Sequence, residues 1–157
     1  MSGPATRVGG VSHASDTAHS SSSMPAAVVV YSHRPEVREA VRTAVGRRPA
    51  ADVGPVTWLE CETGEEVVAT VDAGGVDLCI LDGEAQPTGG LALARQLDQE
   101  VHDRPAVCVL IARQADRWLA HWSRAEATLL LPVDPLVAPG VVAELLREQA
   151  RRPVVRR

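Results

Sequence analysis

The sequence predicts an α/β fold of three layers, in which a parallel sheet is covered by helices on both faces. Short apolar runs alternate five times with amphipathic stretches of helical period. The connections between successive runs are long enough for right-handed strand–helix–strand crossovers. The chain has 157 residues, 45% of them hydrophobic, which suffices for one domain with a substantial core.

The strands are expected where β-branched and other apolar residues dominate a short run, and residues 26–31 form a continuous one, as in strands buried on both faces. These runs predict five strands, over residues 26–31, 56–61, 76–81, 106–111 and 127–131.

The helices are expected between these runs, where apolar residues recur on one helical face. Pro35 stands where a first-turn proline is tolerated, and Gly46 and Gly74-Gly75 are natural helix ends. The pattern predicts helices over residues 36–45, 63–71, 90–101, 115–124 and 136–149.

Five strands of this kind most commonly form a flavodoxin-like (βα)5 sandwich with strand order 2-1-3-4-5. Its switch point lies between the first and third strands, and ligands bind there at the carboxyl ends of the strands. The loops after Tyr31 and after Leu81 then border one crevice, and Asp82 stands in it at the end of an apolar strand.

Composition narrows the function classes. All 16 basic residues are arginine, and residues 25–150 hold 11 of them against 19 acidic residues. An acidic body argues against nucleic-acid binding, and no segment is apolar enough to cross a membrane. Three cysteines in apolar runs give neither a disulfide framework nor a metal pattern, so we expect small buried side chains in a cytoplasmic protein.

The two ends differ from this body. Residues 1–24 are rich in Ser and Gly and are predicted to be a disordered tail, with Met24 as an alternative start. Residues 25–150 form the predicted domain, and residues 151–157 a basic C-terminal tail. Because the last helix stands so near the end, we expect any signal to pass to another chain.

Four segments in order resemble the receiver domain of response regulators, the phosphorylatable module of two-component phosphorelay signalling. They are residues 28–38, Asp82 with the Pro87 and Gly90-Leu91 that follow it, residues 109–113 and residues 125–135. The chain also resembles stand-alone receiver-like (pseudo-receiver) proteins of actinobacteria. The resemblance implies that Asp82 is the candidate phosphoacceptor.

The departures from this family pattern concern the residues that handle phosphate. Ser32 and His33 stand where receivers carry an acidic pair for magnesium, Ile111 replaces the switch Thr or Ser, and Leu131 replaces the lysine. Charge neutralisation dominates phosphoryl transfer, and only Arg34 or His33 offers a cation near Asp82. We therefore expect a degenerate receiver that is not an enzyme, needs no cofactor and signals by protein–protein interaction.

Two alternatives remain open. In one, Asp82 accepts phosphate from a histidine kinase or small donor, with Asp82 and Glu84 as weak Mg²⁺ candidates. In the other, the chain is a different α/β enzyme that uses Asp82, although no phosphate loop or nucleophile elbow is present.

Two loop residues near Asp82 also have alternative interpretations. If Glu84 binds no metal, it is either a solvated loop carboxylate or a permanent charge that mimics phosphate. His33 either pairs with Asp82 or is exposed.

Three further features bear on partners and redox chemistry. Trp118 and Trp122, one helical turn apart, are a candidate partner face for an effector, a kinase or a homodimer, unless one of them packs on the sheet. Trp58 is expected in the core.

Cys79 and Cys108 each precede their strand's end by three residues, so with the strands in register their thiols should be neighbours.

Overall fold

A computed structural model describes residues 24–152 of the chain. Five parallel strands form one sheet in the order β2-β1-β3-β4-β5, which confirms the predicted fold class. The strands are β1 (Ala26–Tyr31), β2 (Val56–Cys61), β3 (Leu78–Asp82), β4 (Ala106–Ile111) and β5 (Ala127–Leu130).

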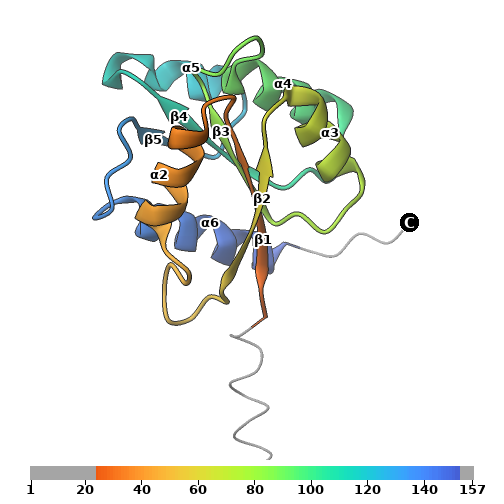
Figure 1. Ribbon diagram of the computed structural model, residues 1–157. Coiled ribbons are helices and arrows are strands. Elements are labelled where there is room, and N and C mark those ends of the chain that lie inside the picture. Colours follow the sequence, from red (N-terminus) through yellow and green to blue (C-terminus); the bar gives the residue numbers. More distant parts are fainter. Residues whose placement is uncertain (1–23, 153–157) are drawn as a thin grey trace, which may run out of the picture.

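The helices form the two outer layers. They are α2 (Pro35–Val45), α3 (Gly64–Asp72), α4 (Gly90–Glu100), α5 (Arg117–Trp122), which follows the 3-10 turn η2 (Gln114–Asp116), and α6 (Ala138–Arg151). Figure 1 shows α2 and α6 on one face of the sheet and α3 and α4 on the other. Successive residues of a strand point to opposite faces, so Val28 and Val30 join one core and Val29 and Tyr31 the other.

Local sequence explains where several helices begin and end. Pro35 occupies the first turn of α2, and Gly46 ends that helix with a φ of 81°. Thr63 caps α3: its hydroxyl accepts from the Glu66 backbone N–H, while the Glu66 side chain accepts from the Thr63 N–H. This reciprocal capping satisfies two amides that a helix start would otherwise leave unpaired.

β3 and α6 each begin two residues later than the sequence pattern predicts, and a side chain explains each shift. β3 begins at Leu78, because Asp77 turns its carboxylate onto the Ala27 backbone N–H at 2.8 Å. α6 begins at Ala138, because Asp134 first organises a turn: its carboxylate accepts from the Leu136 N–H and its carbonyl from Val137 and Ala138.

The predicted proximity of Cys79 and Cys108 is wrong. Cys79 is paired with Val107 and Cys108 with Ile80, so the two cysteines stand one residue out of phase. A shift of one residue sends side chains to opposite faces of a sheet. Cys79 accordingly lies in the core with α4, and Cys108 in the core with α6. All three cysteines are buried and free.

The predicted tails lie largely outside the described residues. Arg151 and Arg152, assigned to the basic tail, instead stand at the end of α6, where they pair with Glu144 and Glu126. Among the helices within residues 24–152, none combines the length and apolarity that a membrane crossing requires.

Candidate functional site

The site centres on Asp82, at the carboxyl end of β3. Because β1 and β3 are neighbours with Tyr31 opposite Leu81, the next residue of each strand, Ser32 and Asp82, emerge side by side. Both are fully buried. The Ser32 hydroxyl donates to Asp82 Oδ2 at 2.7 Å. Ser32, which the resemblance placed beside Asp82, is therefore in direct contact with it.

Arg34 supplies the cation of the site. Its Nη2 donates to Asp82 Oδ2 at 3.0 Å, while its side chain stays 37% exposed. The Arg34 backbone N–H donates to Ser32 Oγ at 3.0 Å. Asp82 Oδ1 accepts from the Glu84 backbone N–H at 2.9 Å. Both carboxylate oxygens thus have donors within the chain.

Two glycines let the surrounding backbone close around Asp82. A Cβ on Gly90 would lie 2.8 Å from the Asp82 carbonyl oxygen and from that of Leu81, so only glycine fits at the start of α4. A Cβ on Gly83 would lie 2.5 Å from the Leu110 carbonyl oxygen, which accepts the Gly83 N–H. The loop after Asp82 is pressed against β4.

A second arginine, Arg38, holds the backbone of the loop after β1 at Ser32. It is buried, and its Nη1 donates to the Ser32 carbonyl at 2.6 Å. Its Nε donates to Glu60 on β2 at 2.9 Å, and Arg42 pairs with the same carboxylate at 3.3 Å. Sequence reasoning missed Arg38. The sequence held one signal for it. Arg38 lies one helical turn after Arg34, and Glu60 lies near the end of the strand that neighbours β1.

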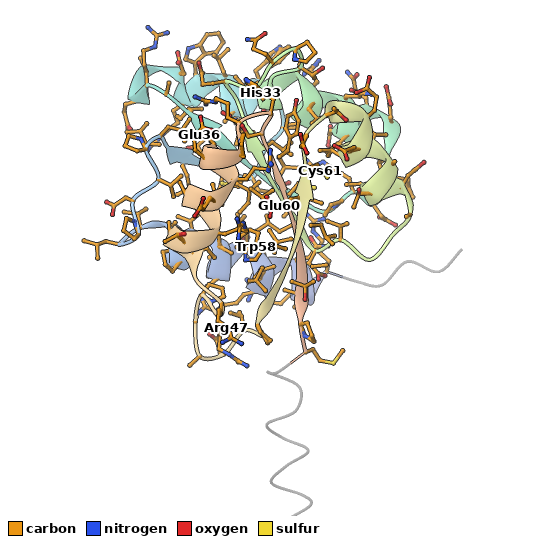
Figure 2. All side chains as sticks on the ribbon, in the orientation of Figure 1. His33, Glu36, Arg47, Trp58, Glu60 and Cys61 are labelled. Carbon is orange, nitrogen blue, oxygen red and sulfur yellow. The ribbon has the colours of Figure 1, made fainter. Side chains whose placement is uncertain are left out.

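His33 does not pair with Asp82. Its side chain is exposed, and Nδ1 accepts from the Gln86 backbone N–H at 2.9 Å, which ties the loop after β1 to the loop after β3. Figure 2 shows His33 at the edge of the molecule where the strands end. Arg34 occupies the position beside Asp82 that the hypothesis gave to His33.

Ile111, at the end of β4, and Leu131, directly after β5, are the apolar residues predicted to neighbour Asp82. Leu131 lines a hollow of about 490 Å³ with Arg34 and Glu84. Its remaining lining residues are Glu36, Val37, Ala40, Ala112, Pro132 and Val133. Ile111 is buried at the end of β4 within the core that α4 covers. Neither side chain can donate a hydrogen bond to an oxygen at Asp82.

Glu84 acts on Asp82 through its backbone, while its carboxylate is exposed. The charge of that carboxylate reaches Arg113. The pKa of Arg113 is raised, first by its hydrogen bond with Asp116, then by the charge of Asp116, and to a smaller extent by Glu84.

Tyr31 adds a further tie across the site that the sequence did not reveal. Its buried hydroxyl donates to the Thr88 carbonyl, which fixes the loop that leads into α4. Burial raises the pKa of Tyr31, and the nearby Asp82 charge raises it further. Tyr31 therefore stays a neutral donor.

The two candidate partner residues both lie on the surface. Trp118 is 66% exposed and Trp122 49% exposed, so neither packs on the sheet. The Arg95 guanidinium of α4 stands 4.7 Å from the centroid of the Trp122 ring. Trp58 is partly buried against the core beneath α2 and α6, close to its expected place.

An aspartate buried at the switch point of a five-stranded 2-1-3-4-5 sheet is the arrangement that the resemblance to a receiver-type α/β domain led us to expect. No family model matches the sequence. The chain is 47% identical over 123 residues to uncharacterized response regulatory proteins of two Mycobacterium tuberculosis strains, CDC 1551 and H37Rv. The match covers 78% of this chain and 92% of theirs. The chain belongs to the response regulator family.

Solved structures agree on the fold. The response regulatory domain of protein mrkE from Klebsiella pneumoniae superposes with a TM-score of 0.66 at 15% identity, covering 80% of this chain and 99% of that one. The REC domain of AraT, a response regulator from Geobacillus stearothermophilus, gives 0.64 at 21% identity, covering 82% and 100%.

The magnesium ion implied by the receiver resemblance does not fit these residues. A hard cation needs several oxygen ligands, preferably charged. Here Ser32, which stands in place of an acidic residue, donates its hydroxyl to Asp82 Oδ2, and a guanidinium already stands 3.0 Å from the same oxygen. Within residues 24–152, no group of three or more His, Cys, Asp or Glu side chains is arranged to hold a metal.

Proposed function

We propose that this response regulator works as a pseudo-receiver: its acceptor aspartate is held by an internal arginine, and it signals by binding a protein partner. The observation that carries the proposal is the Arg34–Asp82 ion pair at 3.0 Å, reinforced by the Ser32 hydroxyl on the same oxygen.

Chemistry at Asp82 supports this function. Phosphoryl transfer to a carboxylate needs an accessible oxygen and fixed cations around the transferred group. Asp82 has 0% exposure, and both of its oxygens accept hydrogen bonds. An incoming donor would have to displace Arg34 and Ser32, while the aliphatic Leu131 offers no replacement charge. Loss of one fixed electrostatic group typically costs about 10²–10³ in rate.

The arginine also explains how the buried aspartate is tolerated. Burial of an unpaired carboxylate is costly, whereas an ion pair with additional hydrogen bonds offsets much of that cost. Arg34 thus gives the site a fixed charge balance without a metal ion or a phosphoryl group. A partner protein of this module, whether a histidine kinase or a downstream effector, would meet one stable surface in the cytoplasm.

Incubation with acetyl phosphate and Mg²⁺, followed by intact-mass measurement, tests the proposal. We expect no phosphoryl adduct on the wild-type chain. The competing function, a phosphoacceptor receiver, requires an adduct that disappears in Asp82→Asn. Arg34→Ala removes the internal cation but does not restore the missing acidic pair or lysine. An adduct on this variant would mean that Arg34 alone closes the site. No adduct would mean that the site is also incomplete.

A further inference from the structure

The hollow that Arg34 lines, here called the Arg34 hollow, lies at the edge of the sheet where the strands end. Its volume is about 490 Å³, and it is bounded by the start of α2 and by the segments that follow β3, β4 and β5. Small-molecule sites in parallel α/β sheets commonly occupy this edge, and pockets of about 300–1,000 Å³ are the usual size. Both the position and the volume therefore suit a small ligand.

One wall of the Arg34 hollow is aliphatic. Val37 from α2 lines it together with Leu131 and Val133, which follow β5, and these three residues are here called the aliphatic wall. All three are only partly buried, so an apolar group placed against them would remove further apolar surface from water. Because Leu131 stands where the family pattern has a lysine, the hollow is more apolar in this chain than that pattern would make it.

The charged residues of the Arg34 hollow favour a positively charged group. Glu36 and Glu84 line the hollow, and both are exposed. Within residues 24–152, neither carboxylate forms an ion pair. Among the residues that line the hollow, Arg34 is the one cation, and Asp82 already balances its charge at 3.0 Å. Two uncompensated carboxylates select a cation by charge complementarity.

Arg34 also lacks an acceptor. Its Nη2 donates to Asp82 Oδ2, but its Nε is buried and has no hydrogen-bond partner among the described residues. A buried N–H without an acceptor costs free energy, and native structures rarely leave one. The Glu84 backbone N–H donates to the other oxygen of Asp82, so Arg34 and Glu84 are held on the same carboxylate. One small molecule can therefore offer an acceptor to Arg34 and a cation to Glu84.

We propose that the Arg34 hollow binds a small apolar zwitterion of the class of the aliphatic α-amino acids. The ammonium group of the ligand faces Glu36 and Glu84, its carboxylate accepts from Arg34, and its side chain packs against the aliphatic wall. The inference adds a ligand to the proposed function and rests on it, because this arrangement requires Arg34 to stay paired with Asp82.

Amide NMR spectra of the full chain, titrated with L-leucine at neutral pH, test the inference. We expect saturable shifts with a millimolar or lower dissociation constant, centred on the amides of Val37, Glu84 and Val133. Three analogues each remove one feature of leucine: 4-methylpentanoate lacks the ammonium group, 3-methylbutylamine lacks the carboxylate, and L-alanine lacks the larger apolar body. The first two should bind about three- to tenfold more weakly than L-leucine, and L-alanine about tenfold or more.

Substitutions at the rim test the charges from the side of the protein. Glu36→Gln and Glu84→Gln keep the size of each side chain and remove its charge, so each should weaken L-leucine binding about threefold. Both side chains are exposed, so the fold should persist. Figure 2 shows Glu36 in the same part of the molecule as His33, where the strands end. Glu39→Gln is the matched control: Glu39 is exposed on the same helix, does not line the hollow, and its variant should bind like the wild type.

Three results would overturn the inference: no saturable shift of these amides at tens of millimolar L-leucine, binding of either charge-deficient analogue as tight as that of L-leucine, or equal weakening by Glu39→Gln and Glu36→Gln. No phosphoryl donor enters this titration. Failure to bind L-leucine therefore leaves the acetyl phosphate result untouched, whereas an adduct on Asp82 would overturn the proposed function even if L-leucine binds.

Discussion

The guanidinium of Arg34 lies 3.0 Å from the carboxylate of Asp82, and this contact joins the loop after β1 to the end of β3. The two residues are 48 positions apart in sequence. The neighbouring strands carry their loops to one crevice, so a single arginine can neutralise the aspartate that the receiver resemblance marks as the phosphoacceptor.

Removal of this cation should destabilise the fold. In Arg34→Gln, Asp82 loses its charged partner while remaining buried, and we expect the free energy of unfolding to fall by about 1–3 kcal/mol. Urea denaturation measures the change. Arg113→Gln is the control: it breaks an ion pair with Asp116 in which the arginine side chain is 75% exposed, so it should change stability far less. Equal losses in both variants would contradict the role of Arg34 as the charged partner of a buried carboxylate.

The close approach of α4 to β3 gives a second prediction. Gly90→Ala would place a Cβ 2.8 Å from backbone atoms of Asp82 and Leu81, which cannot move as a flexible side chain would. We expect a loss of about 1–3 kcal/mol in urea denaturation. Gly140→Ala in α6 meets nothing within 4 Å and should instead stabilise the chain by up to about 1 kcal/mol. An unchanged free energy of unfolding in Gly90→Ala would contradict the close approach of α4 to the end of β3.

The buried thiols predict how stability depends on pH. Burial raises the pKa of Cys108 to about 12, whereas a thiol in the unfolded chain ionises near about 8.5. The unfolded state therefore loses its proton first, and the thiol's stabilising contribution declines as pH rises through this window. Between about pH 8 and about pH 10, the fall in unfolding free energy should be about 2 kcal/mol smaller in Cys108→Ala.

Val107→Ala is the control for this pH experiment. It removes apolar volume from the neighbouring position of β4 and leaves every thiol in place, so its pH dependence should match the wild type. An unchanged slope in Cys108→Ala would mean that the thiol ionises as readily in the folded chain as in the unfolded one.

Restoring the family's charged residues should create a magnesium response. The variant Ser32→Asp, His33→Asp, Arg34→Asn, Leu131→Lys regains an acidic pair and a lysine and loses the internal cation. Ligands that bind the folded state raise its stability by mass action, so millimolar Mg²⁺ should raise the Tm of this variant and leave that of the wild type unchanged. A comparable rise in the wild type would contradict the misfit of its site.

Most of the fold could be predicted because apolar runs determine it. β1, β2 and β4 have the predicted bounds: each begins directly after a proline, and β1 and β4 are apolar throughout. The errors arose where a side chain competes with the regular pattern, as Asp77 does before β3 and Asp134 before α6. The cysteine error came from strand register, where one residue decides the face.

The site was predictable at Asp82 and less so around it. Position in the sheet follows from strand order, so Asp82 and Ser32 could be placed near each other. The choice between Arg34 and His33 as the nearby cation could not be made from sequence, because it depends on which side chain turns inward. Arg38 escaped notice because its partner, Glu60, belongs to a strand 22 residues away.

The central claim is that Arg34 closes Asp82 to phosphate, and amide NMR spectra of residues 24–157 test it most directly. We predict that beryllofluoride, with or without Mg²⁺, leaves the wild-type spectrum unchanged at millimolar concentration. The restored variant serves as the positive comparison. Shifts in the wild type that require Mg²⁺, centre on Asp82 and vanish in Asp82→Asn would contradict the account and identify a working phosphoacceptor.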